Sequence, residues 1–473
     1  MDSRITARAL AVALGGWRTR EPAYEALADG IRLLCLDNRL AARTALPAER
    51  ELAAALRLSR TTVAAAYRSL RDSGHIESLR GSGSVTLPRP QRDAGRVTVA
   101  EDAIDLQQAS PAAWPGLAGL MTEAAMDAAT LVARAGYDLR GSLALREAIA
   151  SRYTSLGVPT SPDDVLVTTG AQSAIHLLAE TLLRRGDRAL IETPTYPHAA
   201  EALRAAGARL VGIPVTTDDG WDLDRATQAF ARTSPRLAYL MPRFQNPTGR
   251  CMTAVDEKVF GDAARQAGTT LIVDETTSEL AIDGGGRMPA FADAPAHVVR
   301  VGSLGKTVWG GLRVGWIRAS PELIQHLIAM RPARDLGTPE FEQAVAVRAI
   351  AQLPGILRQR ADLLREGRDA VSAALAVQLP QWRVPQVNGG VALWVELDAP
   401  LSSGLVLAAR ENGVSLSAGS RFAVDSALDR RLRVPFTAPV DDLRRAVDVL
   451  AAVWPSVRVG APTPSGELLE AVV

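Results

Sequence analysis

Among 53 lysine and arginine residues this chain has only two lysines, Lys258 and Lys306. Lys306 ends the sequence Gly-Ser-Leu-Gly-Lys after a strand-like, valine-rich run, and the glycines let other groups approach closely. Arginine stays charged at physiological pH, whereas a lysine in a dry pocket can lose its proton and form a Schiff base with an aldehyde. Lys306 therefore points to pyridoxal phosphate. The alternative explanation for the scarcity of lysine is a composition that drifted toward arginine and left two lysines by chance. Lys258 lies in a polar, helix-like stretch from Thr253 to Ala267, and a solvated helix face explains it.

Earlier strand-like runs are also followed by residue types that this cofactor needs. Gly170, Ala171 and Gln172 open a helix, where backbone N–H groups and the helix dipole suit a phosphate. Tyr196, between two prolines, could stack on a pyridine ring, and Asn246 could donate to the phenolic oxygen. Each also has a plainer interpretation: a tight turn, a surface tyrosine or an ordinary Asn-Pro turn.

Asp274 follows the apolar run Leu-Ile-Val directly. A carboxylate there would keep the pyridine nitrogen protonated, which lets the ring withdraw electrons; the alternative is a helix cap. Ser303 and Arg313 flank Lys306 and would bind the phosphate. Five such signals in order along the chain make coincidence a poor explanation.

The elements that must position these residues alternate in type. Strand-like runs are separated by amphipathic segments, which predicts an α/β fold with a mostly parallel sheet covered by helices on both faces. Ligands of such folds bind beyond the carboxyl ends of the strands. The predicted strands are 165–168, 189–192, 237–241, 270–273 and 298–301.

The N-terminal region differs in kind. It predicts helices over 24–37, from 46 and from Ser59, a good N-cap residue, with Val63, Tyr67 and Leu70 as a buried stripe. Two short strands, 75–79 and 84–87, flank the turn Arg-Gly-Ser-Gly. This order is that of a winged helix-turn-helix. Residues 39–92 hold ten arginines and four acids, a local charge of +6 that suits nucleic acid; a solvated basic face is the alternative.

The motifs Leu-Pro-Ala-Glu-Arg-Glu-Leu-Ala, Leu-Ser-Arg-Thr-Thr-Val and Gly-Ser-Gly closely resemble the DNA-binding domain of GntR transcriptional regulators. The resemblance implies that residues of the helices contact DNA phosphates and base edges in the major groove. It also implies that residues at the tip of the wing reach the minor groove. Ala64 stands where many relatives have arginine, so one base contact of those relatives is missing. Their operator sequences therefore cannot be assumed for this chain. The implied major-groove residues are Arg50, Ser59, Arg60, Thr61 and Thr62, and those of the wing tip are Arg80 and Gly81.

From about residue 104 onward the motif order resembles the aspartate aminotransferase family, fold type I of the pyridoxal-phosphate enzymes. The resemblance implies that Lys306 carries the internal aldimine, Asp274 contacts the pyridine nitrogen, and Asn246 contacts the phenolic oxygen. It also implies a smaller C-terminal subdomain. The remaining implied roles are stacking for Tyr196, phosphate binding for Gly170, Ala171, Gln172, Ser303 and Arg313, phosphate binding across a dimer interface for Tyr137, and grip of a substrate carboxylate for Arg433.

Two positions depart from the aminotransferase pattern. Thr276 stands where relatives usually have tyrosine, and Gly305 where many have serine. Loss of the tyrosine removes a large donor to the phenolic oxygen, which puts turnover in doubt more than cofactor binding.

Together the two parts resemble the MocR subfamily of bacterial regulators, which implies a homodimeric, cytoplasmic, DNA-binding sensor of an amino compound or of pyridoxal phosphate itself. A working aminotransferase with an accessory head and a cofactor-free DNA-binding dimer are the alternatives. The predicted domains are 20–88 for the head, 89–103 for a linker and 104–473 for the body. Neither a metal cluster nor a membrane segment is expected, and two distant cysteines suit a reducing compartment. The effector, the operator and the sign of regulation are not predicted.

Overall fold

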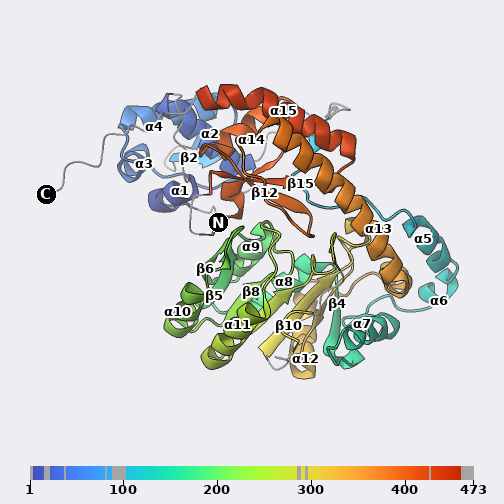
Figure 1. The fold of residues 1–473 in the computed structure, drawn as a ribbon. Coiled ribbons are helices and arrows are strands. Elements are labelled where there is room, and N and C mark those ends of the chain that lie inside the picture. Colours follow the sequence, from blue (N-terminus) through green and yellow to red (C-terminus); the bar gives the residue numbers. More distant parts are fainter. Residues whose placement is uncertain are drawn as a thin grey trace.

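The computed structural model describes residues 4–14, 22–36, 39–79, 83–87, 103–284, 289–292, 297–424 and 428–459. The wing-tip residues Arg80 and Gly81 and all but the last residue of the predicted linker lie outside these ranges. Figure 1 shows a helical head beside a small C-terminal subdomain, with a larger sheet-containing domain below them. None of the described helices is long and apolar enough to cross a bilayer.

The head confirms the predicted winged helix-turn-helix. Its elements are α1 (Ala7–Leu14), α2 (Ala23–Leu36), α3 (Glu49–Leu56), α4 (Arg60–Asp72), β1 (Ile76–Leu79) and β2 (Gly83–Thr86). The Ser59 hydroxyl caps α4 by accepting a hydrogen bond from the Thr62 N–H at 3.0 Å. Val63, Tyr67 and Leu70 are buried, as the helical spacing predicts.

One helix of the head was not predicted. In α1, Leu10 and Leu14 are four residues apart and fill the head core, with 0% and 5% of their surface exposed. The helix packs on α3 and α2 (Figure 1). Two leucines in an arginine-containing stretch are a weak local signal, so tertiary packing decides this helix.

The large domain contains an eight-stranded sheet in the order β4-β11-β10-β9-β8-β5-β6-β7. All five predicted strands are present, and the neighbours from β10 to β6 pair in parallel. The sequence did not indicate β6, β7 and β11; β11 runs antiparallel between β10 and β4, and β7 is antiparallel at the edge. The strands are β4 (Val165–Thr168), β5 (Arg188–Thr193), β6 (Arg209–Thr216), β7 (Gly220–Trp221), β8 (Leu237–Leu240), β9 (Thr270–Asp274), β10 (Val298–Ser303) and β11 (Gly315–Arg318).

Helices cover both faces of this sheet, as predicted. One face packs against α8 (Ala171–Leu182), α9 (Pro197–Ala205) and α12 (Pro321–Met330). The other packs against α10 (Leu223–Thr233) and α11 (Ala254–Ala267) at one end, and against α5 (Leu117–Ala125), α7 (Leu143–Ser155) and α13 (Glu340–Gln378) at the other. A short helix, α6 (Ala128–Val132), follows α5 at the edge of the molecule (Figure 1).

The small subdomain is built on a three-stranded sheet of β12 (Ala392–Glu396), β15 (Arg431–Pro435) and β14 (Ser417–Ala418). Helices α14 (Ser402–Glu411) and α15 (Val440–Val459) and the end of α13 pack on it. The first strand after the linker region, β3 (Ile104–Asp105), pairs in parallel with β13 (Val414–Ser415). Helix α2 of the head rests on α14, and Leu33 joins the core of this subdomain. The head is therefore in direct contact with the subdomain that carries Arg433.

Candidate functional site

A cavity of about 170 Å³ lies at the carboxyl ends of the sheet strands. Nine of the ten predicted cofactor residues line it, and only Tyr137 does not. The turns after β4, β5, β8, β9 and β10 each contribute, so residues more than 100 positions apart meet there. The lining residues are Ser110, Gly170, Ala171, Gln172, Tyr196, Met241, Asn246, Asp274, Thr276, Ser303, Gly305, Lys306, Gly310 and Arg313.

Lys306 lies in the turn after β10, and its partly buried side chain lines the cavity. Its Nζ donates a hydrogen bond to the Ala109 carbonyl oxygen at 2.7 Å. Desolvation, together with the nearby positive charge of Arg433, lowers the pKa of Lys306 to about 8, although Asp274 opposes the shift. A substantial fraction of the amine is therefore neutral near pH 7 to 8, as a nucleophile must be. By contrast, the exposed Lys258 pairs with Asp262 on α11, so the solvated-face interpretation of that lysine is confirmed.

Asp274 is the last residue of β9 and is only 1% exposed. One carboxylate oxygen accepts a hydrogen bond from the Thr276 N–H at 2.8 Å, and the other accepts one from the Tyr239 hydroxyl. Burial raises the pKa of Asp274, while these hydrogen bonds act in the opposite direction. No helix starts at this residue, which excludes the helix-cap interpretation. A buried carboxylate at the cavity wall can stabilise a protonated ring nitrogen.

Tyr239 was missed by sequence reasoning. It lies inside β8, is fully buried, and directs its hydroxyl at Asp274. A buried tyrosine normally needs a hydrogen-bond partner for its hydroxyl, so a tyrosine in an apolar run was the available signal. The identity of that partner depends on the pairing of β8 with β9.

Gln245 joins the turns that carry Asn246 and Tyr196. Its amide nitrogen donates to the Pro194 carbonyl oxygen at 2.7 Å, and its amide oxygen accepts from the Thr248 N–H at 3.1 Å. Tyr196 packs edge-on against a histidine ring, and burial raises its pKa to about 12, so the phenol is neutral at physiological pH. The buried Asn246 amide oxygen has no hydrogen-bond partner in the described part of the chain. The donor that a phenolic oxygen would need is the amide nitrogen of the same side chain.

The phosphate end of the cavity is a close-fitting turn. Gly170 has φ +81°, and a Cβ atom there would lie 3.0 Å from Nη2 of Arg313. Arg313 donates to the Thr169 carbonyl oxygen at 3.1 Å, which holds the guanidinium over the N-terminus of α8. The Ser303 hydroxyl accepts a hydrogen bond from the Gly305 N–H at 3.0 Å. Arginine, serine and a helix N-terminus are suitable donors for phosphate. The residues present therefore fit pyridoxal phosphate at both its ring end and its phosphate end.

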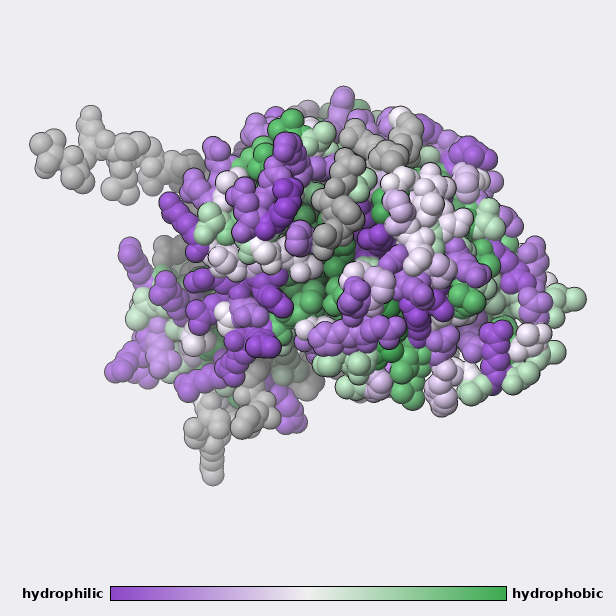
Figure 2. All heavy atoms as spheres, turned by 90° about the horizontal axis from the view of Figure 1, so that it is seen from below, coloured by the Kyte–Doolittle hydropathy of each residue, from purple (hydrophilic) through white to green (hydrophobic). Residues whose placement is uncertain are grey.

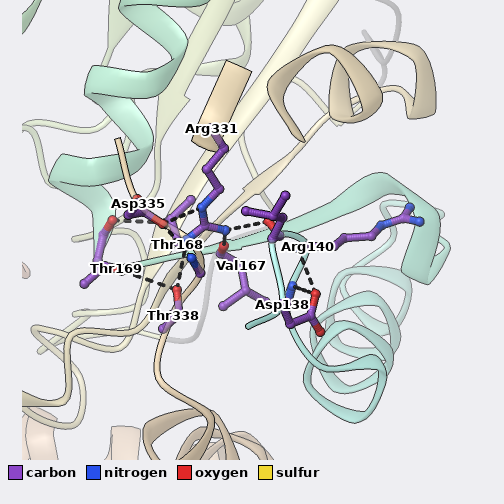
Figure 3. Close-up of polar contacts among 12 residues, drawn as sticks. Asp138, Arg140, Val167, Thr168, Thr169, Arg331, Asp335 and Thr338 are labelled. Atoms are coloured by element: carbon purple, nitrogen blue, oxygen red, sulfur yellow. Dashed lines mark hydrogen bonds and ion pairs between the residues drawn. The ribbon is translucent and has the colours of Figure 1, made fainter. Parts of the chain in front are cut away.

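A buried arginine braces this end of the site (Figure 3). Arg331 donates from Nη1 to the carbonyl oxygens of Leu139 and Val167, both at 2.7 Å, and from Nε to Asp335 at 2.7 Å. Its side chain is 1% exposed. These bonds join the end of β4, which leads into the phosphate turn, to the loop that follows Tyr137.

Replacement of Arg331 by methionine should lower the melting temperature by roughly 5 to 10 °C, because two buried carbonyl groups and a carboxylate lose their donor. Thermal unfolding followed by circular dichroism measures this. Arg265→Met is the matched control, since Arg265 also forms an ion pair but is 61% exposed, and its melting temperature should stay close to that of the wild type. Equal melting temperatures for the two variants would contradict a bracing role.

Arg433 and Tyr137 lie outside the cavity lining. Arg433, on β15, is 6% exposed; it donates to the Gln107 carbonyl oxygen and lies 4.7 Å from the centre of the Phe422 ring. Burial lowers its pKa to about 10, which leaves the guanidinium charged at neutral pH. Arg433 and Lys306 donate to the carbonyl oxygens of Gln107 and Ala109, which are two residues apart, so both side chains reach the same short segment. Tyr137 is 74% exposed in the loop before α7.

The predicted DNA-contacting residues that the structure describes gather at the start of α3 and α4. Arg50, Arg60 and Thr61 are exposed, and Thr62 is partly buried. Arg60 lies 3.7 Å from Glu49. The Ser59 hydroxyl is already engaged as the cap of α4, although it keeps lone-pair and donor capacity for a phosphate.

Comparisons with known proteins agree with this two-part organisation. Residues 121–450 match the family "Aminotransferase class I and II", and residues 23–85 match "Bacterial regulatory proteins, gntR family". The HTH-type transcriptional regulator YdfD of Bacillus subtilis, which is uncharacterized, is 26% identical over 442 residues, covering 85% of this chain and 90% of that protein. The probable rhizopine catabolism regulatory protein MocR of Rhizobium meliloti is 31% identical over 332 residues, covering 64% and 66%.

The fold has a solved counterpart in LysN, the α-aminoadipate aminotransferase of Thermus thermophilus, complexed with N-(5'-phosphopyridoxyl)-L-leucine. Its TM-score is 0.70 at 26% identity, covering 76% of this chain and 94% of that chain.

Fold and cavity thus define a fold type I, pyridoxal-phosphate-dependent body joined to a DNA-binding head. The chain belongs to the aminotransferase class I and II family and also carries a gntR-family domain, a combination consistent with a MocR-type fusion.

Proposed function

We propose that this chain is a transcriptional regulator whose aminotransferase-like domain holds pyridoxal phosphate on Lys306 and senses an amino compound or the cofactor itself. One observation supports this above the others. A single cavity collects Lys306, Asp274, Asn246 and Tyr196, in a chain whose N-terminal domain presents exposed arginines on a winged helix-turn-helix.

The side chains divide the work of binding. Lys306 would supply the amine for the aldehyde, Asp274 would hold the ring nitrogen, and Asn246 would donate to the phenolic oxygen. Tyr196 would stack on the ring. When bound, the cofactor supplies a carbonyl group that exchanges amines and a ring that withdraws electrons. Ser303, Arg313 and the backbone of Gly170, Ala171 and Gln172 hold the phosphate.

The effector site lies toward Arg433. A buried, charged guanidinium close to Lys306 can grip a carboxylate bidentately while the amino group of the same molecule reaches the cofactor. The charge of Arg433, and its contact with the same segment as Lys306, therefore favour an amino acid or a related amino-carboxylate over a simple amine.

A second copy of the chain covers the outer surface of α5 and α6. Met126 is 82% exposed, Val132 80% and Leu143 55%, and Tyr137 lies in the same stretch. Figure 2 shows hydrophobic residues reaching the surface at the right-hand edge, where α5 and α6 lie in Figure 1. Exposed large apolar side chains in one region are typical of an interaction surface. A dimer on this face would bring Tyr137 to the phosphate of the neighbouring site, and sedimentation velocity tests the dimer directly.

In the head, Arg50, Ser59, Arg60, Thr61 and Thr62 contact the major groove and its phosphates. Arg80 and Gly81 reach the minor groove from the wing tip. Two heads in a dimer read two half-sites, which gives a longer operator than one winged helix can specify.

A working aminotransferase is the second candidate, because the cavity keeps a full set of cofactor-binding residues and a neutralisable lysine. The experiment is addition of a panel of amino acids to the cofactor-loaded protein, with the absorbance spectrum and keto-acid production followed together. A regulator shows a spectral shift with one amino compound and little product. Steady keto-acid production with an amino acceptor would support the enzyme, and a protein that never takes up the cofactor would refute both.

A further inference from the structure

The head carries a basic groove, bounded by Arg4, the start of α3, the start of α4 and the wing strand β2. Its volume is about 720 Å³, and Arg4, Arg50 and Arg60 line it. Arg50 and Arg60 belong to the segment that matches the gntR family, residues 23–85, whereas Arg4 precedes that segment. The N-terminal extension thus adds a third arginine to a groove otherwise made by the winged helix-turn-helix.

The extension is fixed to the wing by backbone pairing. Arg4 forms a parallel bridge with Ala45, and Ala45 forms an antiparallel bridge with Val85 in β2. The Ile5 N–H donates to the Ala45 carbonyl oxygen at 3.1 Å. Residues 4–5 therefore add a short backbone segment beside residue 45 at the edge of the small wing sheet.

Helix α1 anchors the same extension from its other end. Leu10 and Leu14 are buried in the head core, and Arg39 donates to the Ala13 carbonyl oxygen at 3.0 Å. With a bridge on one side and a buried helix on the other, the backbone at Arg4 has a defined position relative to α3 and α4.

The charges in the groove are not balanced. Glu49 is the acid that lines it, and this carboxylate lies 3.7 Å from Arg60. Within the described residues, neither Arg4 nor Arg50 has an acidic side chain at ion-pair distance, and both are exposed. Three guanidinium groups around one carboxylate in a concave surface create a field that attracts a polyanion.

We propose that Arg4, held in place by the N-terminal extension of residues 4–14, is a further DNA-contacting residue and binds a backbone phosphate beside the contacts made by Arg50 and Arg60. This inference rests on the DNA-binding function proposed above. A phosphate is the expected target because Arg4 lies beside the wing strand β2, through its pairing with Ala45, and does not belong to α4, the helix proposed to enter the major groove. Its guanidinium can hold two phosphate oxygens at once.

The test uses the full-length protein and a duplex DNA of random sequence, and measures the binding constant by fluorescence anisotropy at 50 to 200 mM KCl. Arg4→Ala should weaken binding roughly tenfold at the lowest salt, and should reduce the slope of log K against log salt by about 0.9, the value for one lost phosphate contact. Arg4→Lys should keep the wild-type slope, because the charge remains.

Arg8→Ala is the matched control. Arg8 is an exposed arginine on α1 that does not line the groove, and its loss should leave affinity and slope close to those of the wild type. An Arg4→Ala protein with wild-type affinity and slope would overturn the inference, as would an equal loss in Arg8→Ala.

Arg60→Ala separates this inference from the function on which it rests. If Arg60→Ala loses affinity while Arg4→Ala does not, DNA binding stands and the role of Arg4 is refuted. If the wild-type protein binds no duplex at any salt concentration, the proposed function fails and the inference fails with it.

Discussion

Replacement of Lys306 by alanine should abolish the near-visible absorbance of protein-bound pyridoxal phosphate while leaving the circular dichroism spectrum of the protein unchanged. Lys306 supplies the only amine among the residues that line the cavity, and truncation of its partly exposed side chain removes one hydrogen bond to Ala109. The measurement is the absorbance of both proteins after incubation with the cofactor and gel filtration.

Lys258→Ala is the control for this experiment, because it makes the same chemical change on the exposed face of α11. It should retain the full absorbance band. An Lys306→Ala protein that keeps the band would show that the cofactor attaches elsewhere.

The depressed pKa of Lys306 also gives the attachment a pH dependence. Burial lowers the pKa to about 8, so the fraction of neutral amine rises through pH 7 to 9 and then levels off. An ordinary lysine, with a pKa of about 10.4, would continue to gain neutral amine up to pH 11. The initial rate of cofactor uptake should therefore reach a plateau near pH 9. A rate that still rises about sevenfold between pH 9 and 10, as the neutral fraction of an ordinary lysine does, would contradict the lowered pKa.

Replacement of Arg60 by alanine should produce the largest effect on DNA binding. Arg60 is the first residue of α4, the proposed recognition helix, and its side chain is 74% exposed. Loss of an arginine that reads a guanine edge costs about 1 to 3 kcal/mol, which is a five- to 150-fold loss of affinity. The affinity is measured with an operator selected from random duplex DNA, at physiological salt.

Arg68→Ala is a suitable control, because Arg68 is an exposed arginine in the same helix two turns further on. If Arg60 reads a base, its loss should lower specificity as well as affinity, whereas loss of a phosphate contact weakens binding to all sequences alike. Unaltered affinity in Arg60→Ala would count against α4 as the recognition helix.

The features that the sequence predicted well depend on local signals. Ser59 followed by the buried spacing of Val63, Tyr67 and Leu70 predicts α4 because capping and helical periodicity both act within a few residues. Apolar runs that end in Asp274 or lead to Lys306 likewise predict β9 and β10. Since the carboxyl ends of parallel strands share one edge of a sheet, the order of the motifs was enough to place nine of the ten predicted cofactor-binding residues in one cavity.

The features that were missed depend on long-range contacts. Strand β11 is short and ends in Arg318, and only its pairing with both β10 and β4 makes it a strand. Arg331 lies in a charged stretch that is typical of a surface, yet the fold buries it against β4. Tyr239 meets Asp274 only because β8 and β9 pair in parallel. The neighbouring sequence does not reveal the partner in any of these contacts, although a tyrosine inside an apolar run signals that Tyr239 needs one.

The central claim is that occupancy of the Lys306 cavity changes how the heads bind DNA. It is tested most directly by the dissociation constant for the selected operator, measured with and without pyridoxal phosphate and with the amino compound that shifts its spectrum. The account predicts a change of at least about fivefold, and an equal change in the affinity for that compound when DNA is added, because the coupling is reciprocal. Lys306→Ala should bind DNA but show no such response. If the dissociation constant for the operator is the same with and without the cofactor and the amino compound, the protein is not a sensor. The DNA-binding head and the aminotransferase-like body would then act independently.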